Sequence, residues 1–150
     1  MATILLVDDE KILRTLIGVA LRRQDHTVIE AGSGRRAIEQ ARKHGAPLDL
    51  LIADFSLPRM SGLELAVKLR GENPRMAALL LARNPRPARL EQPAETAGCG
   101  VLREPFHIRD LIGEVARLLD LPEGTRMPPA SSHGADSEPG RAVANGDSQP

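Results

Sequence analysis

Five short apolar runs alternate with amphipathic stretches along the chain, and this alternation limits the possible folds more than any other feature. The runs cover residues 3–7, 27–31, 48–53, 77–82 and 101–103. Most of them are continuously hydrophobic, which is typical of strands that are buried on both faces of a sheet. Strict alternation with short connections predicts a parallel sheet with right-handed crossovers and helices on both faces.

The stretches between the runs carry helical patterns of apolar residues. Helices are predicted from Ile12 to Leu21, over residues 33–44, from Ser61 until Gly71 and Pro74 stop it, and over residues 107–119. Ser61 and Glu64 have the spacing of a capping box, in which each side chain accepts a hydrogen bond from the other residue's backbone amide. Pro93 falls in the middle of the remaining stretch, which predicts a short, broken or shifted helix there.

The folded domain is expected to span residues 1–120. Residues 121–150 are rich in proline, glycine and serine and show no apolar periodicity, which predicts a disordered tail and not an output domain. The chain has no apolar run of about eighteen residues, and its start lacks a basic region followed by an apolar segment. We therefore expect neither a membrane span nor a signal peptide, and we expect a cytoplasmic protein.

Charge and aromatic content argue against a nucleic-acid-binding surface. The chain has 20 basic and 20 acidic residues in scattered positions, and its only large aromatic side chains are Phe55 and Phe106. Neither a basic stripe nor a base-stacking surface is therefore expected. Cys99 is the only cysteine, which excludes an internal disulfide, and its place between Gly98 and Gly100 predicts a structural residue in a helix-to-strand turn.

Three carboxylates directly follow two of the apolar runs: Asp8 and Asp9 come after the first run, and Asp54 comes after the third. In a parallel sheet both runs end at the same edge, which is where ligands bind in open α/β folds. Converging carboxylates could hold a divalent cation and offer one oxygen as a nucleophile. The alternatives are an N-cap role for Asp8 and Asp9 at the first helix, and a turn role for Asp54 before Pro58.

Together with two further segments, these residues resemble the receiver domain of bacterial two-component response regulators. The resemblance is carried by Asp8-Asp9, by residues 54–62 (DFSLPRMSG) and by Glu104-Pro105-Phe106, and it covers roughly residues 2–120. It implies a flavodoxin-like, doubly wound five-stranded sheet of order 2-1-3-4-5. It also implies that Asp54 accepts a phosphoryl group from a histidine kinase or phosphotransfer protein, and that Asp8 and Asp9, helped by Asp54, bind Mg²⁺.

Three positions depart from the pattern of the family. Glu104 stands where receivers have a lysine before the proline, and Ala82 stands where they have a serine or threonine. Val101 replaces the usual aromatic residue, and a β-branched valine is stiff about its first side-chain torsion. The acidic cluster is therefore kept, while the residues that sense the phosphoryl group in other receivers are replaced.

Glu104 would repel a phosphorylated Asp54, because two unit charges about 4 Å apart interact by roughly 4 kcal/mol at an effective dielectric constant near 20. Glu104 could turn outward, or crowding by other carboxylates could raise its pKa. Arg83 is the better candidate to supply positive charge, since Arg103 alternates with Glu104 and faces away, but we expect Arg83 to be a solvated surface residue. The bond before Pro105 is predicted to be cis.

Two functions compete. The first is a stand-alone receiver in a phosphorelay, which accepts a phosphoryl group at Asp54 and signals by contact with a downstream protein. The second is a pseudo-receiver, a binding module that acts independently of phosphorylation, and the broken fourth helix favours it. A magnesium-dependent phosphatase or phosphotransferase is the weakest alternative, because haloacid-dehalogenase-like enzymes need an Asp-x-Asp pair and a cap segment. We therefore expect a signalling protein that is not an enzyme and binds neither nucleic acid nor membrane.

Overall fold

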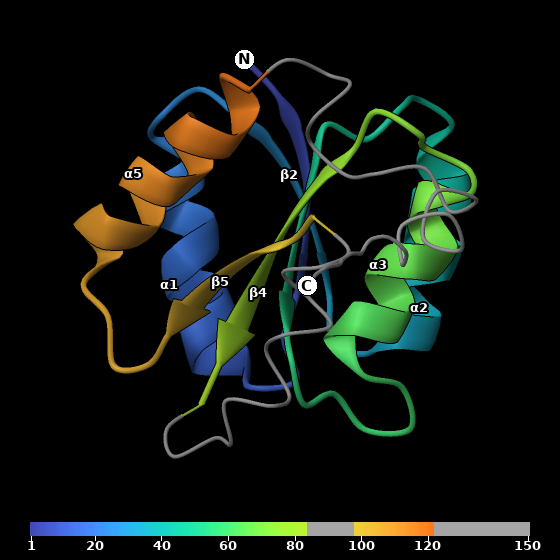
Figure 1. The fold of residues 1–150 in the computed structure, drawn as a ribbon, viewed down its shortest axis with the longest axis horizontal. Helices are drawn as coiled ribbons and strands as arrows, with labels where there is room; N and C mark the ends of the chain where they lie inside the picture. Colours follow the sequence, from blue (N-terminus) through green and yellow to red (C-terminus); the bar gives the residue numbers. More distant parts are fainter. Residues whose placement is uncertain (84–97, 122–150) are drawn as a thin grey trace, which may run out of the picture.

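The computed structural model describes residues 1–83 and 98–121, which form a five-stranded sheet covered by helices (Figure 1). The strands are β1 (Thr3–Val7), β2 (Thr27–Ala31), β3 (Leu50–Asp54), β4 (Ala77–Ala82) and β5 (Gly100–Arg103). The helices are α1 (Lys11–Arg22), α2 (Gly34–His44), α3 (Gly62–Arg70) and α5 (Ile108–Leu119). All neighbouring strands are parallel, in the order β2-β1-β3-β4-β5. The predicted doubly wound, flavodoxin-like fold is confirmed.

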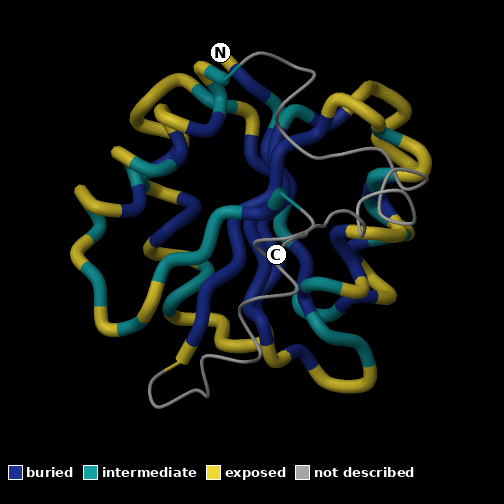
Figure 2. The backbone as a smooth tube through the Cα atoms, in the orientation of Figure 1, coloured by how far each residue is buried: buried dark blue, intermediate teal, exposed yellow. Residues whose placement is uncertain are grey.

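The sheet separates two hydrophobic cores. Helices α1 and α5 cover one face, and α2 and α3 cover the other (Figure 1). Along β1, Ile4 and Leu6 pack on the α1/α5 side, whereas Leu5 and Val7 pack on the α2/α3 side, because successive side chains of a strand point to opposite faces. Strands β1, β3 and β4 form the buried centre of the molecule (Figure 2). Burial on both faces explains why the strands appear in the sequence as continuous apolar runs.

Most predicted boundaries are confirmed, and the differences are small. β3 begins two residues later than predicted and includes Asp54, and β5 begins one residue earlier. In α1, Ile17 and Leu21 are fully buried, whereas Ile12 and Leu16 are 75% and 56% exposed. The apolar residues of α1 therefore form two stripes, and only one of them packs against the core. The predicted fourth helix around Pro93 and the predicted tail lie outside the described residues, apart from Leu121 at the start of the tail.

Two local predictions near the ends of the elements are also confirmed, and the burial of Cys99 agrees with a third, although the helix expected before it lies outside the described residues. Ser61 and Glu64 form the capping box at the start of α3, with hydrogen bonds of 3.0 and 2.8 Å. The Glu104–Pro105 peptide bond is cis. Cys99 is buried just before β5, and burial raises the pKa of its thiol to about 11, as suits a structural cysteine. Within the described ranges, no helix has the length and apolar character needed to cross a bilayer.

The start of α3 lies directly against the end of β3. The backbone N–H of Gly62 donates a hydrogen bond of 3.0 Å to the carbonyl oxygen of Phe55. A β-carbon on Gly62 would collide with the carbonyl oxygen of Asp54. The missing side chain of Gly62 therefore lets α3 pack close enough to hold the backbone of Asp54 in place.

Replacing Gly62 with alanine is expected to destabilise the protein by about 1–3 kcal/mol, because α3 or the end of β3 must move to relieve the collision. Gly113→Ala is the matched control, since Gly113 lies in α5 with nothing near its missing β-carbon. That change should stabilise the protein by about 0.5–1 kcal/mol, the usual gain of alanine over glycine inside a helix. Urea unfolding measures both effects, and equal stabilities for the two variants would contradict the close packing at Gly62.

Candidate functional site

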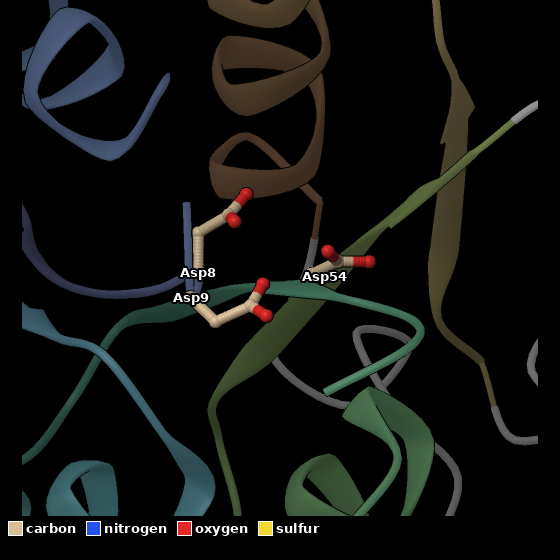
Figure 3. A group of neighbouring side chains, drawn as sticks. All are labelled: Asp8, Asp9 and Asp54. Atoms are coloured by element: carbon tan, nitrogen blue, oxygen red, sulfur yellow. The ribbon is translucent and has the colours of Figure 1, made fainter. Parts of the chain in front are cut away.

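The three predicted carboxylates meet at the carboxyl edge of the sheet. Asp8 and Asp9 follow β1, and Asp54 is the last residue of β3 (Figure 3). One ligand atom from each of the three side chains lies within 4.8 Å of the others. Parallel pairing of β1 with β3, in which Val7 lies beside Ala53, brings the two strand ends together. The predicted convergence of these residues is therefore observed.

The alternation of side chains brings further charged residues to the same side of this edge. Asp8, Asp54, Arg83 and Glu104 each lie two positions after an apolar residue that packs on the α1/α5 side, namely Leu6, Ile52, Leu81 and Leu102. Because side chains repeat every two residues along a strand, the four charged side chains continue on that side. This side of the edge therefore combines Asp8 and Asp54 with an arginine, Arg83, and a further carboxylate, Glu104.

Asp8 is fully buried, and only one of its carboxylate oxygens has a hydrogen-bond partner among the described residues. Oδ1 accepts a 2.9 Å hydrogen bond from the backbone N–H of Glu10, whereas Oδ2 has no partner. Burial, followed by the neighbouring charges of Asp54 and Asp9, raises the pKa of Asp8 to about 6. A buried carboxylate oxygen without a partner is costly, and a cation with oxygen ligands would satisfy it.

Asp54 is also fully buried, and its two oxygens have different partners. Oδ1 accepts a 3.0 Å hydrogen bond from the backbone N–H of Ser56, so the loop after β3 fixes the orientation of the carboxylate. Oδ2 accepts a 3.2 Å hydrogen bond from Nη2 of Arg83. Oδ2 is therefore the oxygen that faces the arginine.

Arg83 reaches the carboxylate cluster through this single nitrogen. Nη2 lies 3.2 Å from Asp54 Oδ2, 3.8 Å from Asp9 Oδ1 and 3.7 Å from Glu10 Oε1. The nearby acidic groups, Asp54 foremost, raise the pKa of Arg83. The side chain is 47% exposed, but its contacts show that the expectation of a merely solvated surface arginine was wrong. The signal for this contact was in the sequence, because Arg83 lies two residues after the buried Leu81.

Glu104 lies beside β4 and does not turn fully outward. Its backbone N–H donates a 2.8 Å hydrogen bond to the carbonyl oxygen of Ala82. Its Oε2 is buried and has no hydrogen-bond partner within the described part of the chain. Burial, followed by repulsion from Asp54 and Glu10, raises the pKa of Glu104, and Arg83 opposes this shift. Glu104 therefore does not turn fully outward, and its pKa is raised more by burial than by the crowding of carboxylates that the sequence suggested.

The two remaining positions of interest lie on the other side of the sheet. Ala82 is fully buried in the α2/α3 core, and Val101 packs against the same core. A methyl group at residue 82 donates no hydrogen bond. Neither residue therefore brings a hydrogen-bonding side chain to the carboxylate cluster.

Mg²⁺ fits the residues that are present. The partnerless oxygen of Asp8 lies in a cluster whose other members also offer carboxylate oxygens, the ligands that Mg²⁺ prefers. One guanidinium does not balance the negative charge of Asp8, Asp9 and Asp54 when all three are ionised. The described site therefore retains both ligand atoms and uncompensated charge for a divalent cation.

Comparison with known proteins identifies the family. Residues 4–116 match the family model of the response regulator receiver domain. The "Probable transcriptional regulatory protein TcrX" of Mycobacterium tuberculosis is 34% identical over 117 residues, which are 78% of this chain and 49% of TcrX. The transcriptional regulatory protein SrrA of Staphylococcus aureus is 31% identical over 133 residues, or 89% of this chain and 54% of SrrA. The chain thus spans about half the length of these curated relatives.

Solved structures show the same fold. The chemotaxis response regulator CheY4 of Vibrio cholerae superposes with a TM-score of 0.66 at 28% identity, covering 78% of this chain and 98% of CheY4. A response regulator receiver domain protein from Clostridium thermocellum gives a TM-score of 0.71 at 24% identity and supports the fold alone, covering 78% of this chain and 93% of that protein. The match over residues 4–116 shows that this chain belongs to the response regulator receiver family of two-component signalling.

Proposed function

We propose that Asp54 is the phosphoryl acceptor of this receiver domain. The supporting observation is the arrangement of its carboxylate, with Oδ1 held by the loop after β3 and Oδ2 facing Arg83 in a cluster with Asp8 and Asp9. A fixed carboxylate beside positive charge is a suitable nucleophile for an anionic phosphoryl donor. The chain would then signal by protein contact and not as an enzyme.

The transfer itself is a displacement at phosphorus. A lone pair of an Asp54 carboxylate oxygen attacks the phosphorus of a phosphorylated histidine, and the P–N bond breaks. The bonding electrons leave with the imidazole nitrogen, which then takes up a proton. Asp8, Asp9 and Asp54 would hold Mg²⁺, which lowers the repulsion between donor and carboxylate when it is bound.

The partners follow from the same chemistry. A histidine kinase or a phosphotransfer protein would supply the phosphoryl group, and a downstream protein would recognise the modified domain. TcrX and SrrA are named as transcriptional regulatory proteins, and this chain corresponds to about half of each. We extend to this chain only the receiver role, with output through protein contact.

Incubation with a small phosphodonor and Mg²⁺ is expected to increase the intact mass of the protein by one phosphoryl group. Asp54→Asn should abolish the adduct, because the amide is a poor nucleophile. Asp120→Asn is the matched control, since Asp120 is exposed at the end of α5, away from the cluster, and this variant should still form the adduct. No adduct on the unmodified protein, despite measurable Mg²⁺ binding, would contradict the proposed acceptor.

Asp8 gives a pH dependence that tests the metal site. Its pKa is about 6 in the folded protein against 3.8 as the reference value. Ionising Asp8 therefore lowers the free energy of unfolding. This free energy is highest below about pH 4, where Asp8 is protonated in both states, and it falls as the pH rises through about 6. The loss is on the order of 3 kcal/mol at neutral pH. Asp8→Asn should thus raise the midpoint of urea unfolding at neutral pH and change it much less near pH 4.

Mg²⁺ should have the opposite pH profile, since its carboxylate ligands must be ionised. We expect Mg²⁺ to stabilise the unmodified protein against unfolding at neutral pH. This stabilisation should disappear as the pH falls below about 6, and it should be weaker for Asp8→Asn. Asp120→Asn again serves as the control. If the unmodified protein and Asp8→Asn unfolded identically at every pH, with and without Mg²⁺, Asp8 would be neither destabilising when ionised nor a metal ligand.

A second candidate function is a pseudo-receiver whose binding surface does not depend on phosphorylation. It is favoured by Ala82 and Val101, which offer no hydrogen-bonding side chain to the site, and by the inward position of Glu104. In this case Asp54→Asn would leave partner binding unchanged. If Asp54→Asn, in an otherwise unmodified protein, abolished partner binding, the pseudo-receiver would be excluded.

A variant that carries the family's residues at positions 82 and 104 tests whether these two replacements weaken phosphorylation. Glu104→Lys combined with Ala82→Thr replaces a repulsive charge with an attractive one and introduces the hydroxyl residue that the family carries at position 82. We expect the adduct on this double variant to last about tenfold longer, as for a site with one more charge-assisted hydrogen bond. NMR shifts in β4 and β5 on phosphorylation should grow as well. Glu39→Lys makes the same charge change on the exposed part of α2 and should alter neither property.

A further inference from the structure

We propose that Arg83 is the phosphoryl-binding residue of this receiver, in place of the lysine that the family carries at position 104. The proposal rests on Asp54 being the phosphoryl acceptor. It is carried by the contact of Arg83 Nη2 with Asp54 Oδ2 at 3.2 Å, from a side chain anchored at the end of the neighbouring strand. Positive charge is thereby supplied from β4 and not from β5.

The geometry around Asp54 gives Arg83 access to an attached phosphoryl group. Oδ1 of Asp54 is held by the backbone N–H of Ser56, so Oδ2 is the oxygen that faces the guanidinium. Once Asp54 carries a phosphoryl group, its own negative charge is lost and the new charge lies on the phosphoryl oxygens. A guanidinium that already contacts Asp54 needs only a small movement to reach them, and its planar array of donors matches phosphate geometry.

No other arginine of the described residues occupies an equivalent place. Arg103 lies on the alternate side of β5 from Glu104, and Arg14 is engaged with the Asp8 carbonyl oxygen at 2.7 Å and with Glu30 at 3.4 Å. Glu104, at the position of the family's lysine, is negative when ionised and contributes no attraction to a phosphoryl group. Among the described arginines, Arg83 alone pairs with Asp54.

The same contacts make Arg83 a competitor of Mg²⁺ before phosphorylation. Nη2 lies 3.8 Å from Asp9 and 3.2 Å from Asp54, two of the three carboxylates of the metal cluster. Removing the guanidinium therefore removes a cation that shares these ligands. Loss of Arg83 should strengthen Mg²⁺ binding while it weakens the binding of a phosphoryl group, and a residue that only supports the fold would not produce opposite effects.

The experiment compares Arg83→Ala with the unmodified protein by two titrations. Calorimetry with Mg²⁺ alone should give a dissociation constant several-fold lower for Arg83→Ala, because a competing positive charge is gone. Beryllofluoride, which mimics a phosphoryl group on a carboxylate, is then titrated at saturating Mg²⁺ and followed by fluorine NMR. Its dissociation constant should rise about tenfold in Arg83→Ala, and the adduct formed from a small phosphodonor should decay faster by a similar factor.

Two variants control for charge and for folding. Arg83→Lys keeps the charge on a different side chain and should recover part of the beryllofluoride affinity. Arg42→Ala removes an arginine that pairs with Glu72 at 3.0 Å, away from the carboxylate cluster, and should change neither titration. Unchanged beryllofluoride binding in Arg83→Ala would overturn this inference while leaving Asp54 as the acceptor. Failure of the unmodified protein to form either adduct would overturn the proposed acceptor itself, and this inference with it.

Discussion

The parallel pairing of β1, β3 and β4 is the constraint on which the site depends. Parallel strands end at one edge of the sheet, and the buried residues of each strand fix which face its last side chain points to. Leu81 packs on the α1/α5 side, so Arg83 continues on that side and meets Asp54. A register shift of one residue in β4 would turn Ala82 toward Asp54 and Arg83 away from it. The apolar core thus decides which charged groups meet.

The site works against the stability of the fold, which is a common property of functional sites. Asp8 and Asp54 are the only fully buried charged residues in the described part of the chain, and one oxygen of Asp8 lacks a partner. The ion pair of Asp54 with Arg83 compensates only in part, since the arginine is half-exposed and its charge is screened by solvent. Capping of α1 does not offset this cost, because the N-cap residue of α1 is Glu10, which makes no side-chain capping hydrogen bond.

The sequence predicted the features that depend on local periodicity. It missed those that depend on which way a helix face or a side chain points in the folded protein. Apolar runs located the strands, and the Ser61–Glu64 spacing located the start of α3, because both signals lie within a few residues. The exposure of Ile12 and Leu16 could not be read from the sequence, since α1 carries two apolar stripes and only tertiary packing selects between them. Arg83 could have been predicted, because the alternation that turns Arg103 away from Glu104 also turns Arg83 toward Asp54.

If Arg83 binds the phosphoryl group as proposed, the positive charge acts from the end of β4 and not from β5. In receivers with a lysine and a hydroxyl residue, two strands each contribute one contact to the phosphoryl group. Here Arg83 directly follows Ala82. Ala82 is buried in the α2/α3 core, and Val101 packs against the same core. A guanidinium that followed the phosphoryl group would pull on the end of β4, whose last residue, Ala82, is packed in the α2/α3 core. Under this proposal, the replacements at Ala82 and Glu104 would act together, whereas in a pseudo-receiver they would be independent losses.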